Sequence, residues 1–298
     1  MKKSVLVFVL ALTMLFVVPT VASAATPTLG ELAATVAALQ TQVNTLQTKV
    51  NTQATQITAL QAKLTAAAPV LALAPYVSVT GSKVNGVKAP NVIFQGVNVH
   101  VRSSSGESDT SGLGNLIIGW NTLPAGTLPV PFRSGSNNLV LGYGNNFTSY
   151  GCLVAGAYNK VGAKYASVSG GSHNTASAAF ASVSGGYKNL ATGDRASVSG
   201  GYANTASAIW ASVSGGSTNT AGGSSATVTG GYKNQASGAS ASVSGGASNS
   251  AKENLTSING GGYNLASTLG ATIGGGLHIT LNSPTQYAWQ AGPSYLWP

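Results

Sequence analysis

The residues that could do chemistry are few and widely separated in this chain of 298 residues. Beyond residue 24 the carboxylates are Glu31, Glu107, Asp109, Asp194 and Glu253. Only Glu107 and Asp109 are close together, in a polar loop where they could bind a cation, although a solvated loop is the simpler interpretation. A glycosidase needs two carboxylates on either side of a cleft, so this set does not indicate glycan hydrolysis.

Histidine, serine and glycine do not supply a site either. His100, His173 and His278 are far apart and lack the spacing of metal ligands. Serine is abundant, but no nucleophile elbow with Asp and His partners is present. Paired glycines recur at every repeat, which indicates corners of the chain rather than phosphate-binding loops. We therefore expect no catalytic residue, no metal and no cofactor.

Cys152 is the single cysteine. In a secreted chain a lone cysteine is either a buried free thiol or a partner in a bond between chains. Counting back by one repeat places Cys152 in the column of Ser167, which is expected to face outward. We favour an unpaired structural thiol, with a contact between chains as the alternative.

A 15-residue repeat determines how the side chains in the second half of the chain are positioned. Residues 166–270 contain seven copies in constant register, with columns of Val, Gly-Gly, Asn and Ala. A fixed short period of this kind is the signature of a repeat architecture. The Val column is Val168, Val183, Val198, Val213, Val228, Val243 and Ile258, continued by Ile273, and the Asn column is Asn174, Asn189, Asn204, Asn219, Asn234, Asn249 and Asn264.

Each repeat fits one coil of a parallel β-solenoid with two short strands and two corners. In the segment 166–169 a large apolar residue alternates with small polar ones, so Val168 should face inward while Ser167 and Ser169 face outward. The glycine pair then turns the chain. Ala176 should face Val168 across the interior, and the Asn side chains should bond from coil to coil at the strand spacing of ~4.8 Å.

One Val and one Ala per coil form a thin interior. The free energy gained by burying them is small compared with the entropy cost of ordering the backbone of the coil. We therefore expect several chains to pack side by side. The alternative is low-complexity disorder, which a composition rich in Gly and Ser would favour. The constant Val and Asn columns argue against it.

The chain before the repeats divides into four segments. Residues 1–24 have the basic start, apolar core and Ala-x-Ala site of a secretion signal. Residues 25–66 are predicted to form a coiled-coil stalk, residues 67–75 a linker, and residues 76–135 an irregular β cap with a Pro-rich insertion. The stalk heptads have apolar a positions and a d series that includes Gln53; the a positions are Val36, Val43, Val50, Ile57 and Leu64, and the apolar d positions are Leu32, Leu39, Leu46 and Leu60.

The repeats themselves are predicted to form a head over residues 136–280, and residues 281–298 an aromatic C-terminal cap. In the last coil Ile279 stands where the period calls for Asn. The cap segment contains two Tyr and two Trp, which we expect to close the open end of the solenoid; these are Tyr287, Trp289, Tyr295 and Trp297.

Charge excludes one large class of partner. The formal net charge is +9, but only 6% of residues are charged, and the basic residues are scattered. This is not the clustered basic surface of a nucleic-acid-binding protein. Removal of Lys2 and Lys3 with the signal leaves +7 (9 minus 2), and no later segment is apolar enough to cross a membrane.

The Ser-Val-Ser-Gly-Gly…Asn-Thr-Ala-Ser-Gly units resemble the head repeats of trimeric autotransporter adhesins. The resemblance covers about residues 114–278 and implies a left-handed parallel β-roll in each of three chains, packed as one head. A coiled-coil stalk is also a trait of that family. Two features depart from it: the family's C-terminal membrane anchor has no counterpart here, and the stalk precedes the head. β-branched a positions with Leu at d favour dimers, whereas the resemblance implies a homotrimer.

The sequence thus predicts a secreted, homotrimeric structural or adhesive protein at the cell surface or outside the cell. A host or matrix surface or a glycan is the expected partner. Six large side chains at the corners are the candidates for contact, although they could only cover neighbouring coils; they are Phe180, Tyr187, Arg195, Tyr202, Trp210 and Tyr232. An ice-binding-like solenoid that orders a surface is one alternative, which thermal hysteresis would identify. A polysaccharide-active β-helix enzyme is another, which release of reducing sugar would identify.

Overall fold

The computed structural model describes residues 26–122 and 133–292. The chain divides into two compact units, residues 1–98 and residues 99–298. The predicted signal segment, residues 1–24, lies outside the described residues, as does most of the Pro-rich insertion. Among the described residues, no helix has both the length and the apolar character that crossing a bilayer requires.

Unit 1 contains one long helix, α1 (Leu29–Leu71), of 43 residues. It begins with a capping box in which the Thr28 hydroxyl accepts from the Glu31 backbone N–H at 3.3 Å and the Glu31 carboxylate accepts from the Thr28 backbone N–H at 2.9 Å. These donors hold the pKa of the Glu31 carboxyl below its usual value. The helix predicted for 25–66 is confirmed, and it runs on through Pro69 into the segment predicted as a linker.

A β-hairpin follows the helix in unit 1. Strands β1 (Val77–Thr80) and β2 (Asn91–Phe94) pair antiparallel. The chain turns at Asn85-Gly86, a pair typical of tight turns: both residues have positive φ, 47° and 83°, and Val84 pairs with Val87 across them. Residues 97–101 form no strand, although Val97, Val99 and Val101 alternate with polar residues.

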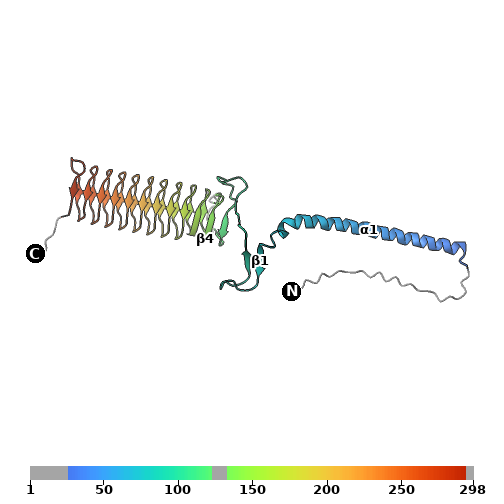
Figure 1. Ribbon diagram of the computed structural model, residues 1–298. Coiled ribbons are helices and arrows are strands. Elements are labelled where there is room, and N and C mark those ends of the chain that lie inside the picture. The colour runs from blue at the N-terminus through green and yellow to red at the C-terminus, as the bar shows by residue number, and fades with distance from the viewer. Residues whose placement is uncertain (1–25, 123–132, 293–298) are drawn as a thin grey trace. The chain divides into compact units, whose positions relative to one another are not determined.

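Unit 2 is a parallel β-solenoid, which Figure 1 shows as a row of stacked coils. Its strands form two parallel sheets, of 12 and 10 strands, and successive coils contribute neighbouring strands to each. The first sheet contains β3 (Leu116–Ile118), β4 (Leu139–Tyr143), β6 (Leu153–Ala157), β8 (Ser167–Val168), β10 (Ser182–Val183), β12 (Ser197–Val198), β14 (Ser212–Val213), β16 (Thr227–Val228), β18 (Ser242–Val243), β20 (Ser257–Ile258), β22 (Thr272–Ile273) and β24 (Trp289–Gln290). The second sheet contains β5 (Asn146–Phe147), β7 (Lys160–Val161), β9 (Thr175–Ala176), β11 (Leu190–Ala191), β13 (Thr205–Ala206), β15 (Thr220–Ala221), β17 (Gln235–Ala236), β19 (Ser250–Ala251), β21 (Leu265–Ala266) and β23 (Thr280–Leu281).

The interior of each coil holds four buried side chains rather than the two expected. Val168 and Ala176 are buried as predicted, and Ala166 and Asn174 are buried with them, all at 0% exposure. The same four columns recur along the repeats. The valines are therefore buried within a single chain. Their burial does not require neighbouring chains to pack side by side, which the thin interior had led us to expect.

The Asn column bonds to the backbone, not from one side-chain amide to the next as expected. The Asn204 side-chain oxygen accepts from the Asn219 backbone N–H at 2.9 Å. Its amide nitrogen donates to the carbonyls of Gly200 and Gly216, both at 2.9 Å. This Asn relay repeats along the coils, with the carbonyls of Leu141 and Ala155 in place of the first glycine in the first coils, because the buried corner leaves backbone groups that the strands do not pair. It starts at Asn121 and ends where Ile279 donates its N–H to Asn264.

For steric reasons, only the second residue of each glycine pair must be glycine. Gly216 has φ +82°, and a Cβ there would lie 2.3 Å from the carbonyl oxygen of Gly231 in the next coil. A Cβ on the first glycine, Gly215, would meet nothing within 4 Å. The tight corner therefore depends on one glycine per coil.

The first coils have a different register, which moves Cys152 to the inside. Leu139 pairs with Leu153, and Leu153 with Ser167, so each of these coils is one residue shorter than the later repeat and Cys152 falls in the column of Ala166. The prediction that Cys152 faces outward is wrong, since the residue is 4% exposed. Its thiol makes no covalent bond within the chain, and burial raises its pKa. Phe147 and Val161 replace Ala in these coils, so the interior is bulkier at the start of the solenoid.

The last coil ends the pattern without Asn. Ile279 is 5% exposed and fills the position of the missing amide. Tyr287 and Trp289 are exposed on the final turn, at 66% and 69%, and β24 adds one strand to the first sheet. Tyr295 and Trp297 lie outside the described residues, so the aromatic closure of this end stays a prediction.

We predict that Asn204→Ala lowers the free energy of unfolding by about 3 kcal/mol, because it leaves buried donors and acceptors of the corner without partners. Ser199→Ala, an exposed change in the same coil, is the matched control and should be close to neutral. Denaturant unfolding of both variants measures the difference. Equal stability of the two variants would show that the Asn relay does not hold the coils together.

Candidate ligand-binding surface

The outward positions at the corners carry the large side chains of the solenoid. Each coil has two corners, one on either edge, because each joins the end of a strand in one sheet to the start of a strand in the other. The first corner includes Tyr187 and Lys188, and the second includes Phe180 and Arg195. One non-glycine residue at each corner has a positive φ, for example 59° at Lys188 and 57° at Phe180. This conformation is uncommon for bulky residues and turns the side chain away from the coil.

An aromatic ladder runs along the second corner through five successive coils. It consists of Tyr150, Tyr165, Phe180, Arg195 and Trp210. The rings of Tyr165 and Phe180 stack with centroids 5.3 Å apart, and Tyr150 meets Tyr165 edge to face at 5.7 Å. The Arg195 guanidinium lies 5.2 Å from the Phe180 ring and 4.9 Å from the Trp210 ring. Asp194 forms an ion pair with Arg195.

Neighbouring members of this aromatic ladder cover part of one another. Phe180 stacks on Tyr165, and Arg195 lies between the rings of Phe180 and Trp210. Phe180 and Trp210 nevertheless remain 45% and 56% exposed. The ladder therefore both links neighbouring coils and offers exposed ring area with one guanidinium.

A second row of rings follows the first corner. Tyr143, Tyr158 and His173 succeed one another with centroids 5.3 Å and 5.0 Å apart. The row continues through Tyr187 and Tyr202, whose rings stack at 5.8 Å. A hydrogen bond with Tyr143 raises the pKa of the Tyr158 hydroxyl.

The six residues predicted for contact thus fall into separate groups. Phe180, Arg195 and Trp210 come together in the aromatic ladder, while Tyr187 and Tyr202 lie in the row at the opposite edge. Tyr232 stands two coils beyond Tyr202 and is accompanied by Lys233, whose ammonium lies 5.0 Å from its ring. The sequence prediction missed Tyr150 and Tyr165, although they precede Phe180 by two repeats and by one repeat, which was a readable signal.

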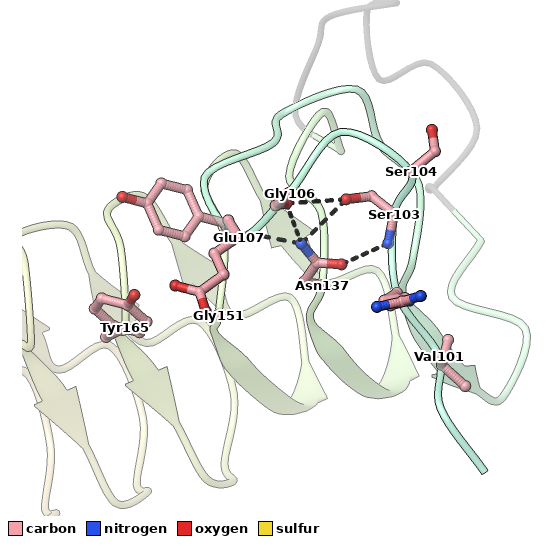
Figure 2. Close-up of a pocket in the computed structure, with 10 residues that line it drawn as sticks. Val101, Ser103, Ser104, Gly106, Glu107, Asn137, Gly151 and Tyr165 are labelled. Carbon is pink, nitrogen blue, oxygen red and sulfur yellow. Dashed lines mark hydrogen bonds between the residues drawn. The ribbon is translucent and has the colours of Figure 1, made fainter.

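A groove of about 860 Å³ opens at the start of the aromatic ladder. Figure 2 shows residues of the loop before β3 on one side and Tyr165 with Gly151 on the other. Among the labelled residues, the Glu107 side chain points toward the Tyr165 side. The groove is lined by Val101, Arg102, Ser103, Ser104, Gly106, Glu107, Asn137, Tyr150, Gly151 and Tyr165.

Asn137 holds the loop that forms the groove wall. Its side-chain oxygen accepts from the Ser103 backbone N–H at 2.7 Å, and its amide nitrogen donates to the Gly106 carbonyl at 3.1 Å and to the Ser103 hydroxyl at 3.2 Å. Ser103 is only 8% exposed. The groove is therefore pre-formed by the fold, which lowers the cost of binding a ligand.

The groove and the aromatic ladder form one surface, because they share Tyr150 and Tyr165. This surface combines ring contacts with one cation, Arg102, one carboxylate, Glu107, and several hydroxyl and amide groups. A mixed lining of that kind is typical of a binding site that fixes a ligand by a few polar groups. Glycoside hydrolysis requires a second carboxylate, and Glu107 is the one carboxylate among the described residues that line the groove.

Asp109, the neighbour of Glu107 in sequence, is engaged elsewhere. Its carboxylate accepts from the Ser111 hydroxyl at 2.6 Å and from the Ser111 backbone N–H at 2.9 Å. The Ser111 hydroxyl in particular holds the pKa of Asp109 below its usual value. Across the described residues, no three His, Cys, Asp or Glu side chains gather where a metal ion could bind.

The fold defines the class of protein as a parallel β-solenoid preceded by a long helix. No protein-family model matches the chain, and no curated protein matches it closely enough to be a relative. The surface of the solenoid and the exposed face of the helix are therefore the guides to function.

We predict that Phe180→Ser with Trp210→Ser leaves the solenoid folded and lowers the free energy of unfolding by no more than about 2 kcal/mol, because exposed ring and cation–π contacts contribute little each. Ser225 and Ser240 already occupy the same column in later coils, with φ of 55°, so serine fits this corner. Circular dichroism and denaturant unfolding measure the effect. Loss of the fold would make the aromatic ladder a structural requirement instead.

Proposed function

We propose that the protein is secreted and acts outside the cell as a homotrimer, in which α1 forms a coiled-coil stalk and the solenoid serves as a structural or adhesive head. The uncovered heptad seam of α1 carries this proposal. The apolar a and d residues lie exposed along the whole helix, for example 53% at Leu32, 55% at Val43 and 64% at Leu60. A seam of this length on a polar helix is stabilised by packing against other helices.

The number of chains follows from the resemblance of the repeats to trimeric adhesin heads. The a and d residues by themselves fit two or three strands. Secretion follows from the signal pattern in residues 1–24. Adhesion is supported by the groove and the aromatic ladder, because large rigid side chains around a pre-formed groove favour tight contact. A host or matrix surface, or a glycan on it, is the proposed partner.

We expect the mature chain, residues 25–298, to have three times the monomer mass in solution. Val43→Glu with Leu46→Glu should make it monomeric, because the seam would bury like charges. Thr41→Glu with Thr48→Glu adds the same charge at f positions of α1 and should leave the mass unchanged. Multi-angle light scattering measures all three proteins. A monomeric mature chain, or a seam variant that keeps its mass, would contradict the proposed stalk.

We expect the trimer to adhere to at least one member of a panel of immobilised matrix proteins, glycans and whole cells. Phe180→Ser with Trp210→Ser should reduce the bound amount at least tenfold, because the two substitutions remove exposed rings and the ring contacts that hold Arg195 in place. Leu255→Ser removes a large exposed residue from the same column at the far end of the solenoid, and is the matched control. If the trimer adheres to no member of the panel, only the structural role of the head remains.

A further inference from the structure

The outer face of the first sheet changes character along the solenoid. In β8 and the strands that follow, the outward positions are almost all Ser or Thr, such as Ser167, Ser182 and Thr227. In the first three strands the equivalent positions are aliphatic, since Leu116, Leu139 and Leu153 pair in one column that continues into Ser167. Ile118 and Leu141 form the neighbouring column.

These five residues, Leu116, Ile118, Leu139, Leu141 and Leu153, make a contiguous aliphatic patch. They lie on β3, β4 and β6, at the green end of the solenoid in Figure 1. The buried residues Val140 and Val154 alternate with them, so the patch faces away from the interior. Leu116 is 46% exposed, Ile118 57% and Leu139 37%. A contiguous apolar patch on a soluble domain marks an interaction site.

Charge indicates what the aliphatic patch contacts. In the part of the chain that the structure describes, none of the strands of the first sheet contains a charged residue. The cations of the solenoid lie on the second sheet or at the corners, for example Lys160, Lys188 and Arg195. Contact between two copies of a basic chain is favoured through a face that lacks this charge, because like charges brought together repel. An acidic partner would be drawn to the corners instead.

We propose that the aliphatic patch is where the heads of sister chains contact one another. The inference rests on the proposed assembly of several chains through α1, which holds the heads at high local concentration and makes a small apolar contact sufficient. The contact is confined to the first three strands, because beyond them the outward columns are hydroxyl groups with little apolar area. The rest of the sheet therefore stays in solvent, and the groove and ladder stay accessible.

Cross-linking through single cysteines tests this contact in the full mature chain. The background variant is Cys152→Ala, which gives this position the residue of Ala166 and the other coils in the column. Leu139→Cys places a thiol in the patch, with Leu153→Cys as a second patch variant. Ser212→Cys places a thiol in the same outward column in the hydroxyl region and is the matched control. Circular dichroism checks that each variant folds.

With a short bis-maleimide cross-linker, we expect covalent dimers from Leu139→Cys or Leu153→Cys and at least tenfold less from Ser212→Cys on denaturing gels. Equal cross-linking at 139 and 212 would overturn the confinement to the patch, because the heads would then pack along their whole length. A three-fold mass with no cross-linking at 139 or 153 would overturn the patch contact and leave the stalk intact. A monomeric chain would overturn the stalk, and with it the contact.

Discussion

The solenoid depends on the hydrogen bonds of one buried Asn in each coil. A corner of the chain cannot satisfy its own backbone groups once it is closed off from water, and an unsatisfied buried donor or acceptor costs about 1–3 kcal/mol. The Asn side chain binds one N–H in the next coil and two glycine carbonyls, so it completes its own corner and fixes the position of the next. The amide can do this only if coil follows coil with the same spacing. The parallel pairing, the Val column and the Ala columns all follow that register.

A fixed interior leaves the outward positions free to differ along the solenoid, and the differences are concentrated at its first end. The groove, the aromatic ladder and the aliphatic patch all lie within the coils before residue 211. Beyond that point the second corner holds Ser225 and Ser240 before Leu255, and the face of the first sheet remains hydroxyl-rich. The first coils are also the ones with Phe147 and Val161 inside, so the part of the head with the widest interior carries the most varied surface.

The two units present different problems of burial. The coils of unit 2 cover their own valines, and the remaining apolar area is local. In unit 1 the apolar a and d residues of α1 are exposed along the described helix, whereas most of the stability of helices in proteins comes from packing of an apolar face. The proposed assembly therefore rests on the helix rather than on the solenoid, whereas the thin interior expected from the sequence had placed it in the solenoid. In the proposed assembly a small patch on the solenoid is enough, because the helix would bring the chains together.

The sequence by itself determined the class of fold, because a 15-residue period with inward Val and outward Ser has few solutions. It also determined the long helix, the hairpin turn at Asn85-Gly86 and the replacement of Asn by Ile279 at the last coil. Only the tertiary structure decided the partners of the Asn amides, because backbone carbonyls from two coils must be placed before an acceptor can be chosen. Only the tertiary structure showed that Cys152 is buried. The coils that contain Leu139 and Leu153 are shorter than the later repeat, and the strand pairing shows this while the 15-residue repeat does not. The groove joins loop 101–107 to Asn137, Tyr150 and Tyr165, which are distant in sequence, so no local pattern could reveal it.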